Sequence, residues 1–288
     1  MNQAQIRPMA FGGSWYPALR DNCQREMDLF EEENPPPQGH TARYGVVPHA
    51  GWFYSGRVAG RVFQHLWENP ELDLVVVLGG HLATADPVVA MTEGAWNTPF
   101  GPMAIHSGFR PALEKTCAGS LYLETPARYQ KDNSTELQLP FAKRRYPQAE
   151  LLPLRLPPSA LATATAQALA DYLENSGLRY VVVASTDLTH YGPNYQFTPK
   201  GSGLAALTWA REENDRAFIQ ALERGTPQDL LDTARARHNA CSAGAAAACH
   251  WMAHQQGLAF HLLDHTSSAD VAGEDAANFV GYLGGIYR

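Results

Sequence analysis

Apolar residues along the chain form two patterns, short uninterrupted runs and runs with helical spacing. One uninterrupted run ends at Val47, and two more occupy residues 74–78 and 180–184. These runs predict strands that are buried on both faces. Residues 55–67, which follow the first run, carry apolar side chains at helical spacing. These two segments therefore predict a strand that leads through a turn into a helix.

The same two patterns predict the remaining elements. We expect short strands or a hairpin at residues 87–92 and 103–106, and further strands at residues 150–156, 260–263 and 278–287. Helices are predicted at residues 21–30, 111–118, 159–175, 204–223, 227–235 and 242–256. Because strands alternate with helices, we predict an α/β fold with a mixed or largely parallel central sheet and helices on both faces. A single domain over residues 1–288 is expected.

Composition narrows the class of protein. Hydrophobic residues make up 45% of the chain and charged residues 18%, which is typical of a soluble globular protein. The formal net charge of −7 argues against a nucleic-acid surface, and glycine-rich nucleotide loops are absent from the sequence. No apolar run approaches the roughly 20 residues of a membrane helix, and the start lacks the layout of a signal peptide. We therefore expect a cytoplasmic protein that binds neither nucleic acid nor membrane.

Histidines follow the strongest strands. His49 stands in PHAG after the first strand, and His81 ends the second in LGGH. Pro48 lacks an N–H and ends the first strand's ladder, so His49 lies just beyond the carboxyl end, where open α/β sheets bind ligands. Imidazoles that converge from separate strand ends can hold a metal. A histidine that only caps a strand end by hydrogen bonding is the alternative for each residue alone.

A third strand leads into STDLTHYG, which contains Asp187 and His190. A carboxylate near an imidazole can fix its tautomer and raise its basicity, which suits a general acid or base. The alternative is that Asp187 caps the turn and His190 fills a polar gap.

Among the four cysteines, Cys241 stands out because it directly precedes the Ala-rich segment. A thiol at a helix N-terminus is favoured as thiolate, which serves a nucleophile or a metal ligand equally well. Cys249, inside that helix, is expected to pack as a small apolar side chain. Asn133 and Glu136 are expected to cap a helix start, and the alternative is that they approach the site through that helix start. The remaining histidines are interpreted as surface or packing residues.

Several motifs together resemble the Memo-like family, which is related in fold to the LigB-type class III extradiol ring-cleavage dioxygenases. They cover nearly the whole chain: GGSWYP, VVPHAGWFYSG, VVVLGGH, WNTPFGPM, DNSTELQLPF, VVVASTDLTHYG, HNACSAG and FVGYLGGIY. The chain departs from the family's usual pattern in two places. It has the shorter turn Gly79-Gly80-His81, and Asn133 stands where many members have a histidine.

The resemblance implies a metal site formed by His49, His81 and Cys241, with Asp187 and His190 beside it. In the related dioxygenases two histidines and a glutamate hold ferrous iron. Cysteine in place of the glutamate makes the donor set softer, so copper or zinc competes with iron.

The function predicted on this basis is that of a metal-dependent redox enzyme acting on a small-molecule substrate in a strand-end cleft. His190, oriented by Asp187, would move protons. Two alternatives stay open: a peptide-binding adaptor that uses the same cleft, and a zinc-dependent hydrolase. A shared metal site requires the donor atoms of His49, His81 and Cys241 to lie within about 4 Å of one another.

Overall fold

A computed structural model describes residues 5–33, 42–273 and 277–288. Its main feature is a nine-stranded sheet in the order β10-β12-β2-β9-β3-β8-β4-β7, with β11 paired to β12. These strands are β2 (Tyr44–Val47), β3 (Leu74–Gly79), β4 (Val88–Met91), β7 (Leu121–Glu124), β8 (Glu150–Arg155), β9 (Tyr180–Ser185), β10 (His190–Tyr191), β11 (Phe260–Ser267) and β12 (Phe279–Tyr287). A small second sheet contains β1 (Ile6–Arg7), β5 (Ala95–Trp96) and β6 (Met103–Ala104).

The centre of the main sheet is parallel. Neighbouring strands β2, β9, β3 and β8 run in the same direction, whereas β12 joins β2 and β4 joins β8 in antiparallel fashion. The predicted mixed α/β sheet is therefore confirmed. Its four central parallel strands place their carboxyl ends along one edge.

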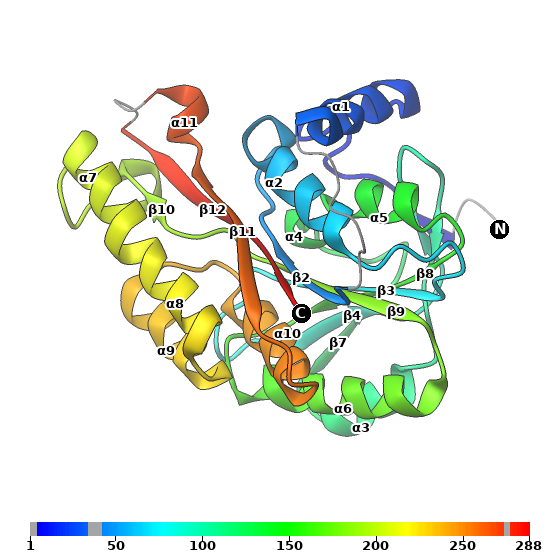
Figure 1. The fold of residues 1–288 in the computed structure, drawn as a ribbon. Coiled ribbons are helices and arrows are strands. Elements are labelled where there is room, and N and C mark those ends of the chain that lie inside the picture. Colours follow the sequence, from blue (N-terminus) through cyan, green and yellow to red (C-terminus); the bar gives the residue numbers. More distant parts are fainter. Residues whose placement is uncertain (1–4, 34–41, 274–276) are drawn as a thin grey trace.

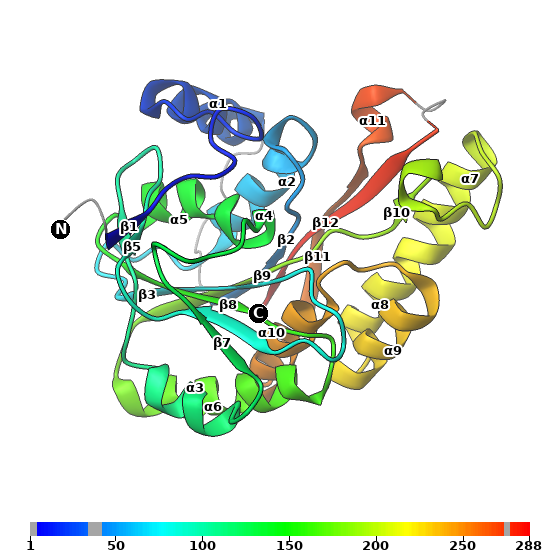
Figure 2. The ribbon, with the colours of Figure 1, turned by 180° about the vertical axis from the view of Figure 1, so that it is seen from behind.

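Helices cover both faces of this sheet, as predicted (Figure 1). One face carries α1 (Arg20–Glu33), α2 (Trp52–His65), α4 (Asn133–Glu136) and α5 (Leu139–Arg145). The opposite face carries α3 (Arg110–Thr116), α6 (Ala160–Ser176) and α10 (Ala243–Gln255), and the reverse view shows the same two layers (Figure 2).

Side chains of the central strands alternate between these two layers. In β3, Val75 and Val77 belong to the apolar cluster beneath α1, α2 and α5, whereas Val76 and Leu78 belong to the cluster beneath α6 and α10. All four are fully buried. Burial on both faces explains why this strand reads as an uninterrupted apolar run.

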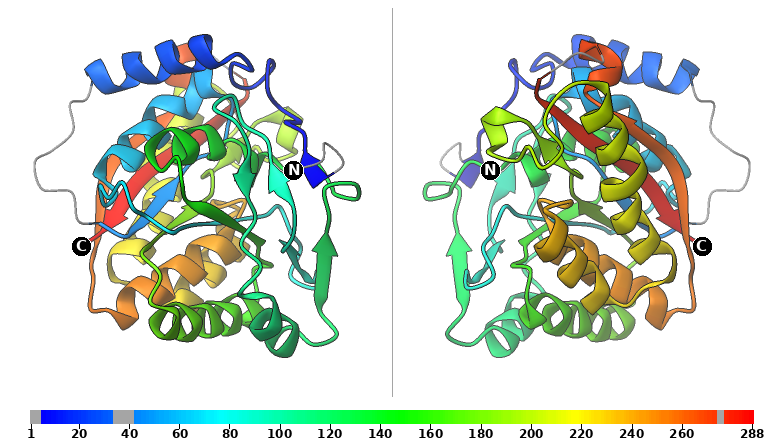
Figure 3. Two further views of the ribbon diagram at one scale, coloured as in Figure 1. Left: turned by 90° about the vertical axis from the view of Figure 1, so that its right-hand side faces the viewer. Right: turned by 90° about the vertical axis from the view of Figure 1, so that its left-hand side faces the viewer.

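Further helices lie beside the antiparallel end of the sheet. They are α7 (Leu204–Trp209), a π-helical stretch (Ala210–Asp215), α8 (Arg216–Arg224), α9 (Pro227–Arg237) and α11 (Ala269–Ala272). The right-hand view of Figure 3 shows α7 and α8 in front of β11 and β12. Within the part of the chain that the structure describes, no helix combines the length and apolar character required to span a membrane.

Two local predictions differ from the structure in part. Residues 87–92 and 103–106 do contain short strands, one of the two predicted alternatives, but they do not form a hairpin, because β4 pairs with β7 and β8 while β6 pairs with β5 in the other sheet. The predicted cap of α4 is also wrong. Asp132 is the N-cap and accepts a hydrogen bond from Thr135 N–H, while Glu136 accepts bonds from Phe11 N–H and the Tyr16 hydroxyl.

Candidate metal centre at the strand ends

Three parallel strands end level with one another at one edge of the sheet. The registers of β2 with β9 and of β3 with β9 align these ends. Two residues beyond the last residue of each strand stand His49, Asp187 and His81, after β2, β9 and β3 respectively. The strand pairing therefore places two imidazoles and a carboxylate at a common edge, although they are far apart in sequence.

The structure brings the three predicted metal ligands together. One potential ligand atom from each of His49, His81 and Cys241 lies within 4.8 Å of the other two. The Cys241 Sγ is 3.1 Å from His49 Nε2, and the two imidazole rings are nearly perpendicular with centroids 4.8 Å apart. This spacing is slightly wider than the expected separation of about 4 Å for ligands of one ion. No other such group of three occurs among the described residues.

The His49 ring is also bonded through Nδ1, the ring nitrogen opposite the one that contacts Cys241. Its Nδ1 lies 2.9 Å from Ser185 Oγ, and Gln138 Nε2 donates to the same hydroxyl at 3.2 Å and to the Pro48 carbonyl at 2.9 Å. If Nδ1 carries the proton and donates it to Ser185, Nε2 is free to bind a metal. Burial lowers the pKa of His49, but the negative charges of Cys241 and Asp187 outweigh burial and leave the pKa above its ordinary value.

Asp187 contacts His49 rather than His190 by hydrogen bond. Its Oδ1 accepts from the backbone N–H of His49 at 2.7 Å, and its Oδ2 is 3.9 Å from His49 Nε2. The expected orientation of His190 by Asp187 is therefore replaced by another contact: His190 Nδ1 donates to the Leu188 carbonyl at 3.1 Å. This bond leaves His190 Nε2 as the nitrogen that can accept a proton.

Charge and burial act on His190 in opposite directions. Burial lowers the pKa of His190 below its ordinary value, and the Asp187 charge offsets only part of that effect. The lowered pKa favours the neutral imidazole, which is the form that a proton acceptor needs.

His81 is exposed and is positioned by Asn133. The Asn133 Oδ1 lies 3.1 Å from His81 Nε2, and its Nδ2 donates to the His49 carbonyl at 3.0 Å. Asn133 thus links the turns that carry both histidines. The shorter Gly79-Gly80-His81 turn still brings His81 to the cluster, and Gly80, with φ of 111°, has a backbone conformation that favours glycine.

Cys241 lies in the turn that leads into α10. The backbone N–H of Asp187 donates to Cys241 Sγ at 3.2 Å, and the Cys241 N–H donates to the Asp187 carbonyl at the same distance. Cys241 is partly exposed, whereas Cys23, Cys117 and Cys249 are buried. The expectation that Cys249 packs in the core is confirmed.

A cavity of about 570 Å³ is lined in part by His49 and His81. Its polar wall includes Asn133, Asp187 and His190, and its other walls are aromatic, with Trp15, Phe53, Tyr54, Tyr195, Phe279 and Tyr282. The mixture of a few polar groups and aromatic walls is typical of small-molecule sites.

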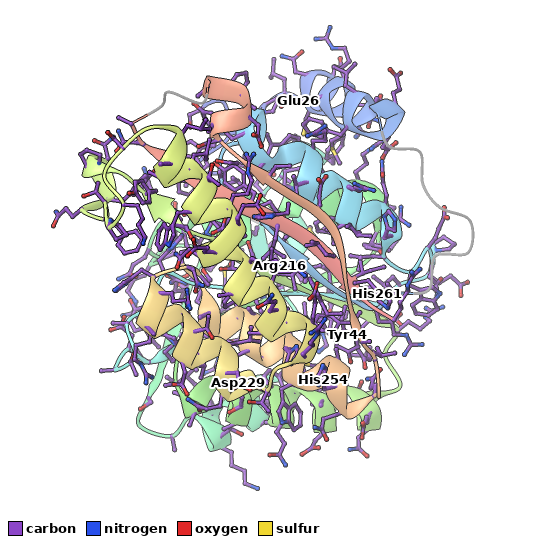
Figure 4. The ribbon with its side chains drawn as sticks, turned by 60° about the vertical axis from the view of Figure 1, so that its left-hand side comes forward. Glu26, Tyr44, Arg216, Asp229, His254 and His261 are labelled. Atoms are coloured by element: carbon purple, nitrogen blue, oxygen red, sulfur yellow. The ribbon has the colours of Figure 1, made fainter. Side chains whose placement is uncertain are left out.

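Four of the other histidines, His106, His250, His254 and His261, lie away from this centre. His106 is bonded to Glu150 and Tyr172, and His250 to Tyr287 and the Gly225 carbonyl. Figure 4 shows His254 near the end of α10 and His261 on β11. None of these residues lines the cavity beside His49 and His81.

Sequence reasoning missed the roles of Ser185 and Gln138. Ser185 stands in the VVVASTDLTHYG motif and therefore carried a signal, but its contact with His49 depends on strand pairing. Gln138 lies in a helical stretch with no local sign of its bond to the Pro48 carbonyl.

A family model and relatives found by sequence point to one family. A family model described as "Memo-like protein" matches residues 7–286. A MEMO1 family protein of Methanopyrus kandleri is 30% identical over 297 residues, covering 98% of this chain and 99% of that protein. One from Archaeoglobus fulgidus is 28% identical over 287 residues, covering 98% and 100%. A solved structure of an uncharacterized Escherichia coli K12 protein, JW3007, matches with a TM-score of 0.49 and 12% identity, covering 83% of this chain and 99% of that one.

Proposed function

We propose that this chain, which belongs to the Memo-like protein family, is a metal-dependent redox enzyme that acts on a small oxygen-bearing substrate. The observation that supports the proposal most directly is the convergence of His49, His81 and Cys241 beside a cavity that His190 also lines. Strong electrostatic coupling of buried titratable groups in a cleft is a common property of catalytic sites.

The donor set suits a redox-active transition metal. Two imidazole nitrogens and one sulfur lie within 4.8 Å of one another, and thiolate with imidazole favours iron, copper or zinc over magnesium or calcium. We propose that His49, His81 and Cys241 hold such an ion, with iron first and copper or zinc as competitors. When bound, the ion would supply Lewis-acid and electron-transfer chemistry.

The chain's own residues would bind the substrate and move its proton. A hydroxyl of the substrate in the cavity can donate to Nε2 of His190, because Nδ1 is already used in the bond to the Leu188 carbonyl. The aromatic walls formed by Tyr54, Tyr195 and Tyr282 would exclude water and pack against an apolar or planar substrate body. Asn133 would keep the His49 and His81 turns in register while the substrate binds.

Oxygen uptake tests this function. Protein purified without air and loaded with Fe²⁺ or Cu²⁺ is mixed with catechols and other phenols at an oxygen electrode. We expect metal-dependent uptake that falls at least about 100-fold in His190→Gln, because general-base catalysis contributes roughly 10²–10⁴ in rate. Uptake that is identical in wild type and in Cys241→Ser, or absent for every phenol, contradicts the redox proposal.

Exposed aromatic residues favour a second candidate, a peptide-binding adaptor that uses the same cleft. Phe53, Tyr54 and Trp15 are 73%, 42% and 41% exposed and line the cavity. Aromatic side chains of this kind often anchor protein partners. If no turnover is found and Phe53→Ala weakens capture of a peptide by at least about tenfold, the adaptor function replaces the enzyme. Redox-inert zinc at full occupancy, with ester or amide hydrolysis, would instead favour a hydrolase.

A further inference from the structure

A second cavity, of about 440 Å³, lies beside the proposed metal centre. The cavity of about 570 Å³ that His49 and His81 line is called the substrate cavity below. Of the residues that line the second cavity, only His190 and Tyr195 also line the substrate cavity. Cys241 lines the second cavity and not the first, whereas His49 and His81 line the first and not the second. The three proposed ligands are thus distributed between two cavities.

The lining of this second cavity determines what it can bind. Leu188, Phe197, Ala234 and Ala240 supply apolar surface, and Gln196 supplies a neutral amide. The remaining lining residues, His190, Tyr195, His238 and Cys241, include no carboxylate, lysine or arginine. An anion would lose its hydration here without a lysine or arginine as partner and would be repelled by a Cys241 thiolate, whereas a cation would find only that thiolate, so the lining favours a small uncharged molecule.

Two residues that line this cavity have a left-handed backbone conformation. Gln196 and His238 are the two non-glycine residues with positive φ in the described part of the chain, at 54° and 51°, and both line this cavity. A positive φ is unfavourable for a residue with a Cβ. Both residues are left-handed C-caps, Gln196 of a 3-10 helix (Pro193–Tyr195) and His238 of α9, so two helix ends meet at this cavity.

We propose that the second cavity is a separate access route for a small uncharged co-reactant, which reaches the Cys241 sulfur and His190 without crossing the substrate cavity. The proposed role as a co-reactant route rests on the proposed redox function. The access itself does not, because it concerns only which cavity leads to the thiol.

Alkylation of Cys241 measures that access directly. The chain has four cysteines, and the other three are buried, so iodoacetamide should modify Cys241 alone in the native protein. The full-length chain is labelled both as isolated and after chelator treatment, and intact mass with peptide mapping gives the rate at Cys241.

Matched variants then fill one cavity or the other. Ala240→Leu adds three carbon atoms to the second cavity, and Ala272→Leu makes the same change in the lining of the substrate cavity. We expect Ala240→Leu to slow alkylation at least about tenfold and Ala272→Leu to change it less than about twofold. An unchanged rate in Ala240→Leu, or equal slowing in both variants, overturns the proposal.

His238→Trp provides a second filled variant if Ala240→Leu fails to fold, and it is expected to slow alkylation in the same way. Melting temperature reports folding, and labelling in denaturant should modify all four cysteines in every variant. If His238→Trp folds and reacts at the wild-type rate, the proposal is likewise overturned.

Charge selectivity tests the class of ligand. Neutral, anionic and cationic methanethiosulfonates are compared, each rate being divided by the rate with glutathione. We expect the neutral reagent to exceed both charged reagents by at least about tenfold, and parity with either one contradicts selection for uncharged molecules. Because none of these readouts needs a bound metal, a failure of metal binding refutes the proposed function and leaves the access route to be judged on its own.

Discussion

Removing the Ser185 hydroxyl tests whether a hydrogen bond to His49 orients this proposed metal ligand. The hydroxyl lies 2.9 Å from His49 Nδ1 and accepts from Gln138 Nε2 at 3.2 Å, in a fully buried position. Ser185→Ala leaves His49 Nδ1 without this partner, while Gln138 keeps its bond to the Pro48 carbonyl. An unpaired buried polar group costs about 1–3 kcal/mol, so we expect a loss of stability of that size.

The same substitution should weaken metal binding, because it frees the His49 ring to rotate or change tautomer. Loss of an orienting partner of this kind typically costs 10–100-fold in metal affinity. Urea unfolding of the metal-free chain measures the first effect, and competition with a chelator of known affinity measures the second.

Thr165→Val is the matched control for Ser185→Ala. Thr165 is also fully buried, and its hydroxyl donates to the Leu161 carbonyl within α6, away from the strand ends. It should lose about 1 kcal/mol of stability and no metal affinity. If Ser185→Ala binds metal as tightly as wild type, or if Thr165→Val weakens binding equally, the orienting role of Ser185 is refuted.

Three further predictions concern the rest of the fold. Burial lowers the pKa of His250 to about 4, so the unfolded chain takes up this proton first as the pH falls below about 6.5. The free energy of unfolding should therefore fall by about 3 kcal/mol between roughly pH 6.5 and pH 4. If urea titrations of a His250→Gln variant show the same pH dependence as wild type, protonation of His250 is not the cause. Gly244→Ala should cost at least about 2 kcal/mol of stability, because a Cβ there would meet the carbonyl oxygens of Leu156 and Pro157. Gly201→Ala has open space and should cost about 1–2 kcal/mol from its positive φ alone. Equal melting temperatures of the two variants would refute this difference. Arg7→Met should cost about 1–3 kcal/mol, because Glu124 and the Gln130 carbonyl lose a buried donor while Glu124 keeps its bond to Arg155, and an unchanged midpoint in denaturant unfolding would contradict this estimate.

The central elements could be predicted because their signals are local. The apolar run of β3 and the helical spacing that follows β2 depend on residues close in sequence, and both elements occur where expected. β10 was not predicted, because it has two residues and is defined by pairing with β12 more than 80 positions away in the sequence. The helix cap shifted by one position, since Asp132 and Asn133 are equally suited to capping and only packing selects one.

The candidate site was only partly predictable for a related reason. Glycine turns and histidines after strands pointed to His49 and His81, and strand pairing does bring these turns together. The contacts of Asp187 with His49 and of Gln138 with Pro48 join residues 138 and 90 positions apart. No local pattern encodes such contacts, so the sequence suggested a partnership of Asp187 with the nearby His190 instead.

Metal analysis after purification without air tests the central claim most directly. Wild type and the His49→Ala, Cys241→Ser double variant are purified in parallel and their bound metal is measured by mass spectrometry, with unfolding curves to establish that both are folded. We predict close to one ion of iron, copper or zinc per wild-type chain. The double variant should lose at least about 90% of this bound metal, because a site without two of its three ligands loses most of its affinity. Equal metal content in the two folded proteins would contradict the account.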